Sequence, residues 1–242
     1  MKKTITFSLL LFLINILSAQ TKEVTFTTED GIKISATFHQ AINDYALSSA
    51  IILIHQGGSS KEEWTESNIW NQLIEKGYSL LAYDIRMHGK SEKDKGDIYD
   101  LFNNPKRAPL DLLAAINFLK KNPKIDTNKI GVLGASIGAN LAAVAASSDK
   151  YDVKSVVAIS AKTAAIKNLN GENKDFKFKN AFFIASKNEQ NGKREKWARE
   201  LVLMTSGEVK ISISKGNKHG SYILRENKRL TNDVINWFIK TL

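Results

Sequence analysis

The hydrophobic and polar residues of this chain follow two patterns, one near its beginning and one over most of its length. Residues 24–30 and 33–40 alternate apolar and polar positions on either side of Asp30-Gly31. Alternation around such a turn predicts an antiparallel hairpin, which we place at a sheet edge. From Ala50 onward the apolar residues instead form short runs: AIILIHQ, SLLAYDI, KIGVLGAS, SVVAIS, AFFIASK and VKISIS. Such runs are typical of strands buried on both faces.

The segments between these runs show helical spacing of their apolar residues. Helices are predicted over 62–76, 110–122, 137–147, 193–205 and 227–240. This alternation predicts an α/β fold with a mostly parallel, eight-stranded, doubly wound sheet, which binds ligands at the carboxyl ends of its strands. The longest expected loop, 161–179, is too short for an independent lid, so no large cap domain is expected.

Residues 1–19 have the pattern of a secretory signal peptide. Lys2 and Lys3 precede an apolar run from about residue 5 to residue 17, and small residues follow at 18 and 19. The alternative is a membrane anchor, which needs roughly 20 apolar residues. We therefore expect cleavage near Ala19 or Gln20 and a single domain over 20–242. The mature chain is expected to be exported to a bacterial periplasm or the medium, without stable membrane insertion.

Composition and charge restrict the possible chemistry. Of 242 residues, 43% are hydrophobic, 25% are charged and none is cysteine, which excludes disulfides, thiolate metal sites and a Cys nucleophile. Removing Lys2 and Lys3 from the 35 basic residues leaves 33 against 25 acidic ones, a net charge of +8. Its densest stretches, 193–196 and 225–229, are interpreted as solvated helix faces, so no nucleic-acid partner is expected. No HExxH motif or other ligand cluster is present, and neither metal nor cofactor is expected.

The sequence G-x-S-x-G over residues 134–138 lies between a predicted strand and an Ala-rich helix. The glycines permit a sharp turn that exposes the hydroxyl of Ser136 above the sheet, which favours Ser136 as a nucleophile. The alternative is a packing turn in which Ser136 only caps the helix.

A serine nucleophile needs a base, and four histidines compete for that role. Three are placed differently: His39 in an edge strand, His55 at a strand end and His88 in an Arg-x-His-Gly loop. His219 follows the last short strand, where a side chain can reach across the top of the sheet, so His219 is the expected base. The alternative is a solvated loop histidine.

These residues together resemble the α/β-hydrolase family over essentially the whole chain after the signal segment. Residues 55–58, His-Gln-Gly-Gly, resemble the family's HGGG or HGxG oxyanion loop, and residues 84–91, DIRMHGKS, are similar to its D-x-R-G-H-G-x-S stretch. Gln56 and Met87 stand where the family usually has glycine. Small size and the absence of a large cap are most similar to the dienelactone-hydrolase-like branch. The true dienelactone enzymes use Cys where this chain has Ser136, so an esterase is expected.

The resemblance also implies an acidic partner for His219. The family's acid follows the strand before the penultimate helix, and Glu189 matches that position. A carboxylate there orients the base and stabilises its imidazolium form. The nearby alternatives are Glu172, Asp175 and Glu195.

Further roles follow from the same resemblance. Two backbone N–H groups stabilise the oxyanion of ester attack, and Ile137 and Gly57 match the donors, with Gln56 as the alternative to Gly57. The side chains His55, Asp84, Arg86 and His88 are interpreted as structural. Possible pocket residues beside the motif loops are Gln56, Trp64, Met87 and Tyr222.

The sequence therefore predicts an exported serine hydrolase that cleaves carboxylic esters through an acyl-enzyme, using a Ser-His-Glu triad. Without a cap the site is expected to be open, which favours short acyl groups on small molecules or polymers. A serine peptidase or thioesterase of the same fold is the alternative. A non-catalytic hydrolase-fold binding protein of the cell envelope is the second alternative.

Overall fold

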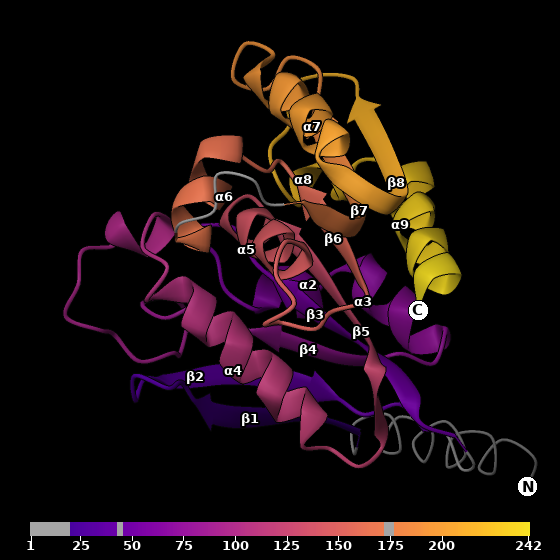
Figure 1. Ribbon diagram of the computed structural model, residues 1–242. Helices are drawn as coiled ribbons and strands as arrows, with labels where there is room; N and C mark the ends of the chain where they lie inside the picture. Colours follow the sequence, from indigo (N-terminus) through magenta and orange to yellow (C-terminus); the bar gives the residue numbers. More distant parts are fainter. Residues whose placement is uncertain (1–19, 43–45, 172–176) are drawn as a thin grey trace, which may run out of the picture.

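The computed structural model describes residues 20–42, 46–171 and 177–242, which form an eight-stranded sheet with helices on both faces (Figure 1). Its strands are β1 (Thr21–Thr27), β2 (Lys33–His39), β3 (Ser48–Ile54), β4 (Ser79–Tyr83), β5 (Ile125–Ala135), β6 (Ser155–Ile159), β7 (Phe178–Ser186) and β8 (Thr205–Ser214). Their order is β1-β2-β4-β3-β5-β6-β7-β8. The β1–β2 and β2–β4 pairs are antiparallel, and the pairs from β4 to β8 are parallel. The expected sheet and its edge hairpin are confirmed.

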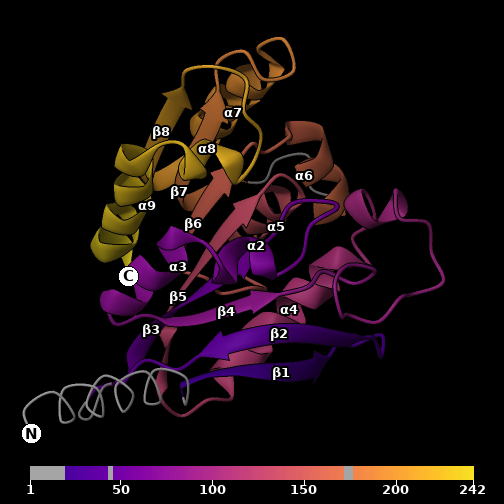
Figure 2. The ribbon, with the colours of Figure 1, turned by 180° about the vertical axis from the view of Figure 1, so that it is seen from behind.

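The helices pack on both faces of the sheet, with an apolar core on each side. They are α2 (Glu62–Thr65), α3 (Asn68–Glu75), η1 (Asp100–Phe102), α4 (Ala108–Lys120), α5 (Ile137–Ala146), α6 (Thr163–Asn170), α7 (Lys193–Leu203), α8 (Tyr222–Arg225) and α9 (Lys228–Thr241). Figures 1 and 2 show α4, α5 and α7 on one face and α3 and α9 on the other. A separate cluster of buried apolar residues fills each side of the sheet.

Three segments differ from the pattern-based prediction. The run VKISIS, expected to be buried on both faces, belongs to the edge strand β8, which has no buried residue. The helix expected over 62–76 is broken, because Ser67 adopts an extended backbone (φ −89°, ψ 153°) and its hydroxyl donates to the carbonyl of Trp64. The loop expected over 161–179 contains α6, whose buried Ala165, Ile166 and Leu169 pack toward the core. Residues 172–176 of that stretch, like the expected signal segment, lie outside the described residues.

The turn from β5 to α5 is packed against the end of β3 with no room for side chains. A Cβ atom on Gly134 would lie 2.0 Å from the carbonyl oxygen of Gly138, and one on Gly138 would lie 2.2 Å from that of Ile54. Because real carbon and oxygen atoms do not approach so closely, both positions require glycine. Helix α5 can therefore begin directly against the carboxyl ends of β3 and β5.

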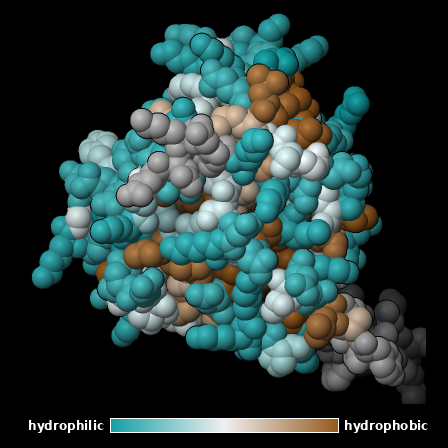
Figure 3. Space-filling view, viewed as in Figure 1, coloured by the Kyte–Doolittle hydropathy of each residue, from teal (hydrophilic) through white to brown (hydrophobic). Residues whose placement is uncertain are grey.

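The face shown in Figure 3 is mostly hydrophilic, with smaller areas of apolar groups between the polar ones. The large hydrophobic side chains exposed among the described residues are Ile42, Leu47, Ile98, Tyr99, Leu203, Val209, Tyr222 and Ile239. Within the described part of the chain, no helix has both the length and the apolar character needed to span a bilayer.

The glycine packing leads to a stability prediction. Gly138→Ala is expected to lower the free energy of unfolding by roughly 3 kcal/mol, because the methyl group must push α5 away from Ile54. Urea denaturation measures this loss. Gly57→Ala is the matched control, since a Cβ there meets nothing nearer than 3.6 Å and neither glycine has a positive φ. Equal losses in the two variants would contradict the close approach.

Candidate active site

Ser136 occupies a strained position at the start of α5. Its φ of 53° and ψ of −108° lie outside the regions that side-chain-bearing residues favour. The Ser136 amide donates to the carbonyl of Ile159 at 2.8 Å, and the Asn140 amide donates to the carbonyl of Ser136 at 3.1 Å. The side chain makes no capping hydrogen bond to α5, and the residue is half-exposed. This geometry favours an available hydroxyl over a serine that only caps the helix.

His219 lies beside Glu189, the acid that the sequence analysis predicts. The imidazole Nδ1 is 2.5 Å from Glu189 Oε1. Because a carboxylate can only accept, this contact requires the proton on Nδ1, and in a neutral ring Nε2 then carries the lone pair. The Glu189 side chain is buried, whereas that of His219 is 38% exposed. A base held in one tautomer, with one nitrogen accessible, is suited to accept a proton.

The hydroxyl of Ser160 connects the loops that carry these two residues. It donates to Glu189 Oε2 at 2.8 Å and accepts from the amide of Gly220 at 3.0 Å. Ser160 ends the β6 run with a φ of 61°, a left-handed conformation that is uncommon for serine. One buried hydroxyl thus fixes the acid relative to the turn that holds His219.

Arg194 is a further charged group at this place, and no motif in the sequence predicted it. Its Nε lies 3.3 Å from Glu189 Oε1, and its Nη1 donates to the carbonyl of Ser160 at 2.5 Å. Burial lowers the pKa of Arg194, and the charge of Glu189 opposes that shift. The interpretation of 193–196 as a solvated face is wrong for this residue, because Arg194 is buried. The sequence signal that could have indicated this contact is the position of Arg194, five residues after Glu189 and at the start of a helix.

The alternative acids do not occupy this place among the described residues. Glu195 pairs with Arg199 one turn along α7, with oxygen and nitrogen 2.7 Å apart. Glu172 and Asp175 lie outside the described residues. Glu189 is therefore the described acid that contacts His219.

The loop after β3 holds Gln56 and Gly57, the two alternatives for one of the oxyanion donors, in different environments. The Gln56 amide lies 3.3 and 3.4 Å from the carboxylate oxygens of Glu63 and donates to that group. Burial raises the pKa of Glu63. Gly57, the next residue, is exposed. Ile137 is the first residue of α5, where helix geometry provides no internal acceptor for the amide. The arrangement favours Gly57 and Ile137 over Gln56.

The four possible pocket residues lie in different environments. The Gln56 side chain packs against Gly220, where an added Cβ would lie 2.0 Å from Gln56 Oε1. The Met87 sulfur accepts a hydrogen bond from Arg107 Nη2 at 3.0 Å, and the Met87 backbone has a φ of 68°. Trp64 is buried and lines a cavity of about 420 Å³ between α2–α3 and α8–α9. Tyr222 is exposed, with the guanidinium of Arg225 5.0 Å from its ring.

His55 is held as a neutral ring beneath the loop. Its Nδ1 donates to the carbonyl of Gln56 at 2.7 Å, and its Nε2 accepts from the amide of Ile85 at 3.0 Å. The His88 ring lies 5.1 Å away, centroid to centroid. Both bonds of His55 are needed to join the ends of β3 and β4, so a second ring proton would break one of them.

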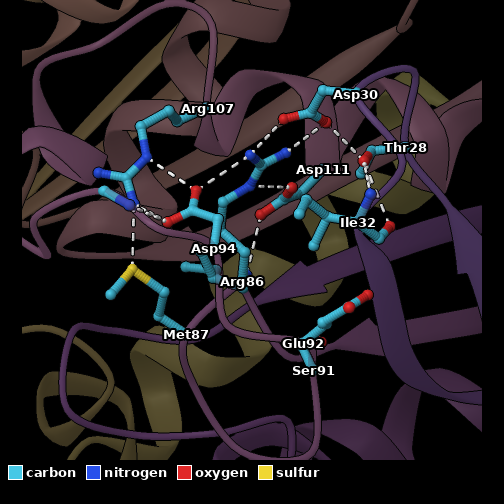
Figure 4. Close-up of polar contacts among 12 residues, drawn as sticks. Thr28, Asp30, Ile32, Arg86, Met87, Ser91, Glu92, Asp94, Arg107 and Asp111 are labelled. Atoms are coloured by element: carbon cyan, nitrogen blue, oxygen red, sulfur yellow. Dashed lines mark hydrogen bonds and ion pairs between the residues drawn. The ribbon is translucent and has the colours of Figure 1, made fainter.

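The residues after β4 are held by buried ionic contacts. The Asp84 carboxylate accepts from the amides of Lys61 at 2.7 Å and Lys90 at 2.9 Å. Figure 4 shows Arg86 between Asp111 and Asp30. Its Nε donates to Asp111 Oδ1 at 2.8 Å, and its Nη1 and Nη2 donate to the two carboxylate oxygens of Asp30 at 2.6 and 2.9 Å.

Within the described residues, no group of three or more His, Asp or Glu side chains is placed to hold a metal ion.

Comparison with known proteins shows the family. The family model described as alpha/beta hydrolase fold matches residues 49–209, and the chain belongs to this family. The resemblance stated from the motifs is thereby confirmed. The chain is 30% identical over 143 residues to the uncharacterized protein YcjY of Escherichia coli, covering 57% of this chain and 45% of that protein. It spans about half the length of the curated relatives it matches, 45% and 50%.

Solved structures share the fold. The esterase Pf2001 of Pyrococcus furiosus superimposes with a TM-score of 0.72 at 22% identity, over 94% of this chain and 95% of that one. Dienelactone hydrolase from Anabaena variabilis gives a TM-score of 0.68 at 18% identity, over 92% and 99% of the two chains. At these identities the likeness concerns the arrangement of the backbone.

The buried His55 leads to a prediction about pH. Burial lowers the pKa of His55 from 6.5 to about 4. Below pH 6.5 the unfolded chain binds a proton at this ring, whereas the folded protein does not until about pH 4. The contribution of His55 to stability is therefore full above pH 6.5, and about 3 kcal/mol of it is lost as the pH drops to 4.

Urea denaturation at several pH values measures the slope of the unfolding free energy against pH. His55→Gln should reduce this slope. Burial also lowers the pKa of His39, so His39→Gln is the matched comparison. We expect the larger change of slope in the His55 variant. An unchanged slope in that variant would show that His55 is protonated in the folded state.

Proposed function

We propose that this protein hydrolyses carboxylic esters, with Ser136 as nucleophile, His219 as base and Glu189 as the acid that orients the base. The observation that carries the proposal is the 2.5 Å contact between His219 Nδ1 and Glu189 Oε1, in a chain whose Ser136 stands strained at the start of α5. Similar structures named esterase and dienelactone hydrolase support esters as the substrate class.

The first half of the reaction forms an acyl-enzyme. Ser136 Oγ attacks the carbonyl carbon while His219 Nε2 takes the hydroxyl proton, and the carbonyl electrons move onto oxygen. The amides of Gly57 and Ile137 donate to that oxyanion, a contribution worth roughly 3 kcal/mol for each donor. The tetrahedral intermediate collapses, the carbon–oxygen bond to the alcohol breaks, and the imidazolium returns its proton to the leaving alcohol.

The second half releases the acid. A water molecule gives its proton to His219 Nε2 and attacks the acyl carbon, and the proton then returns to Ser136 Oγ as the carboxylic acid departs. Glu189 keeps the ring in the required tautomer and stabilises its charged form. Ser160 and Arg194 act through Glu189, because their contacts limit the positions its carboxylate can adopt.

We further propose short acyl groups as substrates and export as the route of the protein. Short acyl groups suit a site without a large cap, and export is supported by the lysines, apolar run and small residues of positions 1–19. Esters of small molecules and acyl groups on extracellular polymers both fit this proposal.

The proposed chemistry is tested by substitution of the three residues. We expect Ser136→Ala and His219→Ala to lower kcat for p-nitrophenyl acetate by about 10⁴-fold or more, and Glu189→Gln to lower it by about 10⁴-fold. Steady-state assays measure these losses, and a fluorophosphonate should label the parent protein but not Ser136→Ala.

Glu195→Gln is the matched control, because it removes a carboxylate from α7 that pairs with Arg199. Its activity should equal that of the parent. Activity retained in Ser136→Ala, or equal losses in the two glutamate variants, would contradict the proposed roles.

Export is tested by expressing the full chain in a Gram-negative host. The expected result is a mature protein in the periplasm or medium, with its N-terminus at residue 20 or 21, as read by N-terminal sequencing. Replacing the apolar residue Leu11 by Arg should leave the uncleaved chain inside the cell. An intact Met1 terminus on the exported parent protein would contradict cleavage.

A further inference from the structure

Residues 92–107, which we call the bridging segment, connect the region after β4 to α4. The segment contains η1, and Figures 1 and 2 both show its coil beside α6. The side-chain amide of Asn168 on α6 donates to Asn103 Oδ1 at 3.1 Å. The bridging segment therefore spans from the loops after β3 and β4 to a helix that follows β6, along the carboxyl edge of the sheet.

Phe102 on this segment lies against the proposed oxyanion loop. A Cβ atom on Gly57 would lie 3.6 Å from Phe102 Cζ and 4.0 Å from Cε1, so the far edge of the ring faces this glycine. Phe102 is half-buried and packs on the larger apolar cluster, while its neighbour Leu101 is fully buried. The ring is thus anchored in the core on one side and faces the exposed loop on the other.

The bridging segment is held at both ends by charged contacts. The guanidinium of Arg107 donates to the carboxylate of Asp94 and to the carbonyl of Asp97 (Figure 4 shows the Asp94 contact). Asp94 also accepts from Arg86 Nη1 at 3.3 Å, which ties the segment to the buried ionic cluster. The segment that carries Phe102 is therefore held in place at both of its ends.

Sheet order indicates which part of an ester meets Phe102. Gly57 follows β3, Ser136 follows the neighbouring β5, and His219 follows β8 at the opposite edge of the sheet. The leaving alcohol must face His219, because the imidazolium protonates it. The acyl group occupies another direction at the carbonyl carbon, on the side away from His219, which is the side where Gly57 and Phe102 lie.

We propose that Phe102 is the specificity-determining residue that limits the length of the acyl group. This inference rests on the proposed function and deepens it, since it assigns the preference for short acyl chains to a particular side chain. The ring blocks the path of a longer chain beside the oxyanion loop, and the anchored bridging segment prevents the ring from moving aside.

The test compares p-nitrophenyl acetate, butyrate and octanoate as substrates, because they share one leaving group and differ only in the acyl chain. We expect Phe102→Ala to raise the ratio of kcat/KM for octanoate over acetate by at least about 10-fold. Phe102→Leu, which keeps packing on the core, should raise it by a smaller factor. Tyr99→Ala is the matched control, an aromatic residue of the same segment that is 74% exposed, and should leave the ratio unchanged.

Thermal melting shows whether each variant is folded. An unchanged or lowered octanoate ratio in folded Phe102→Ala or Phe102→Leu overturns the role of Phe102 while leaving the proposed esterase intact. The same conclusion follows if Tyr99→Ala changes the ratio as much as Phe102→Ala. A parent protein that neither turns over these esters nor reacts with a fluorophosphonate at Ser136 overturns the proposed function and this inference together.

Discussion

The close approach of two glycines to neighbouring backbone is the constraint on which the candidate site depends. Gly134 and Gly138 allow β5, the turn at Ser136 and α5 to pack against the end of β3 without intervening side chains. The serine can then adopt its unfavourable backbone conformation, because the apolar packing of α5 against the sheet offsets a cost of about 1–3 kcal/mol. The same packing brings the loop that contains Gly57 next to the first amide of α5, where a developing negative charge would be stabilised.

Around this rigid turn, buried charges are arranged in matched sets. Glu189 meets His219, Ser160 and Arg194, and each contact satisfies part of a carboxylate that burial would otherwise make costly. On the other side of the turn, Arg86 joins carboxylates from three separate segments and thereby supports the bridging segment. One set holds the proposed base, and the other holds the aromatic ring that faces the oxyanion loop.

The pattern of apolar runs was sufficient to locate the parallel strands, because short apolar runs separated by helical segments are typical of a sheet covered on both faces. It did not show that β8 is an edge strand without a buried residue. It was insufficient for two helical segments. The break at Ser67 depends on a local hydrogen bond to Trp64 that periodicity does not contain. Helix α6 has its apolar residues over only two turns, in a stretch that is otherwise polar, and the neighbours that bury it come from distant parts of the chain.

The sequence by itself determined the fold class, the strand-to-helix turn around Ser136 and the position of His219 after the last strand, because these follow from local spacing and chain order. Only the tertiary structure distinguished Glu189 from Glu195, since Glu189 contacts His219 whereas Glu195 pairs with Arg199. It likewise decided that Gln56 donates to Glu63, that Arg194 is buried and that Phe102 faces Gly57. Contacts between residues far apart in the chain arise from packing, and no local pattern encodes them.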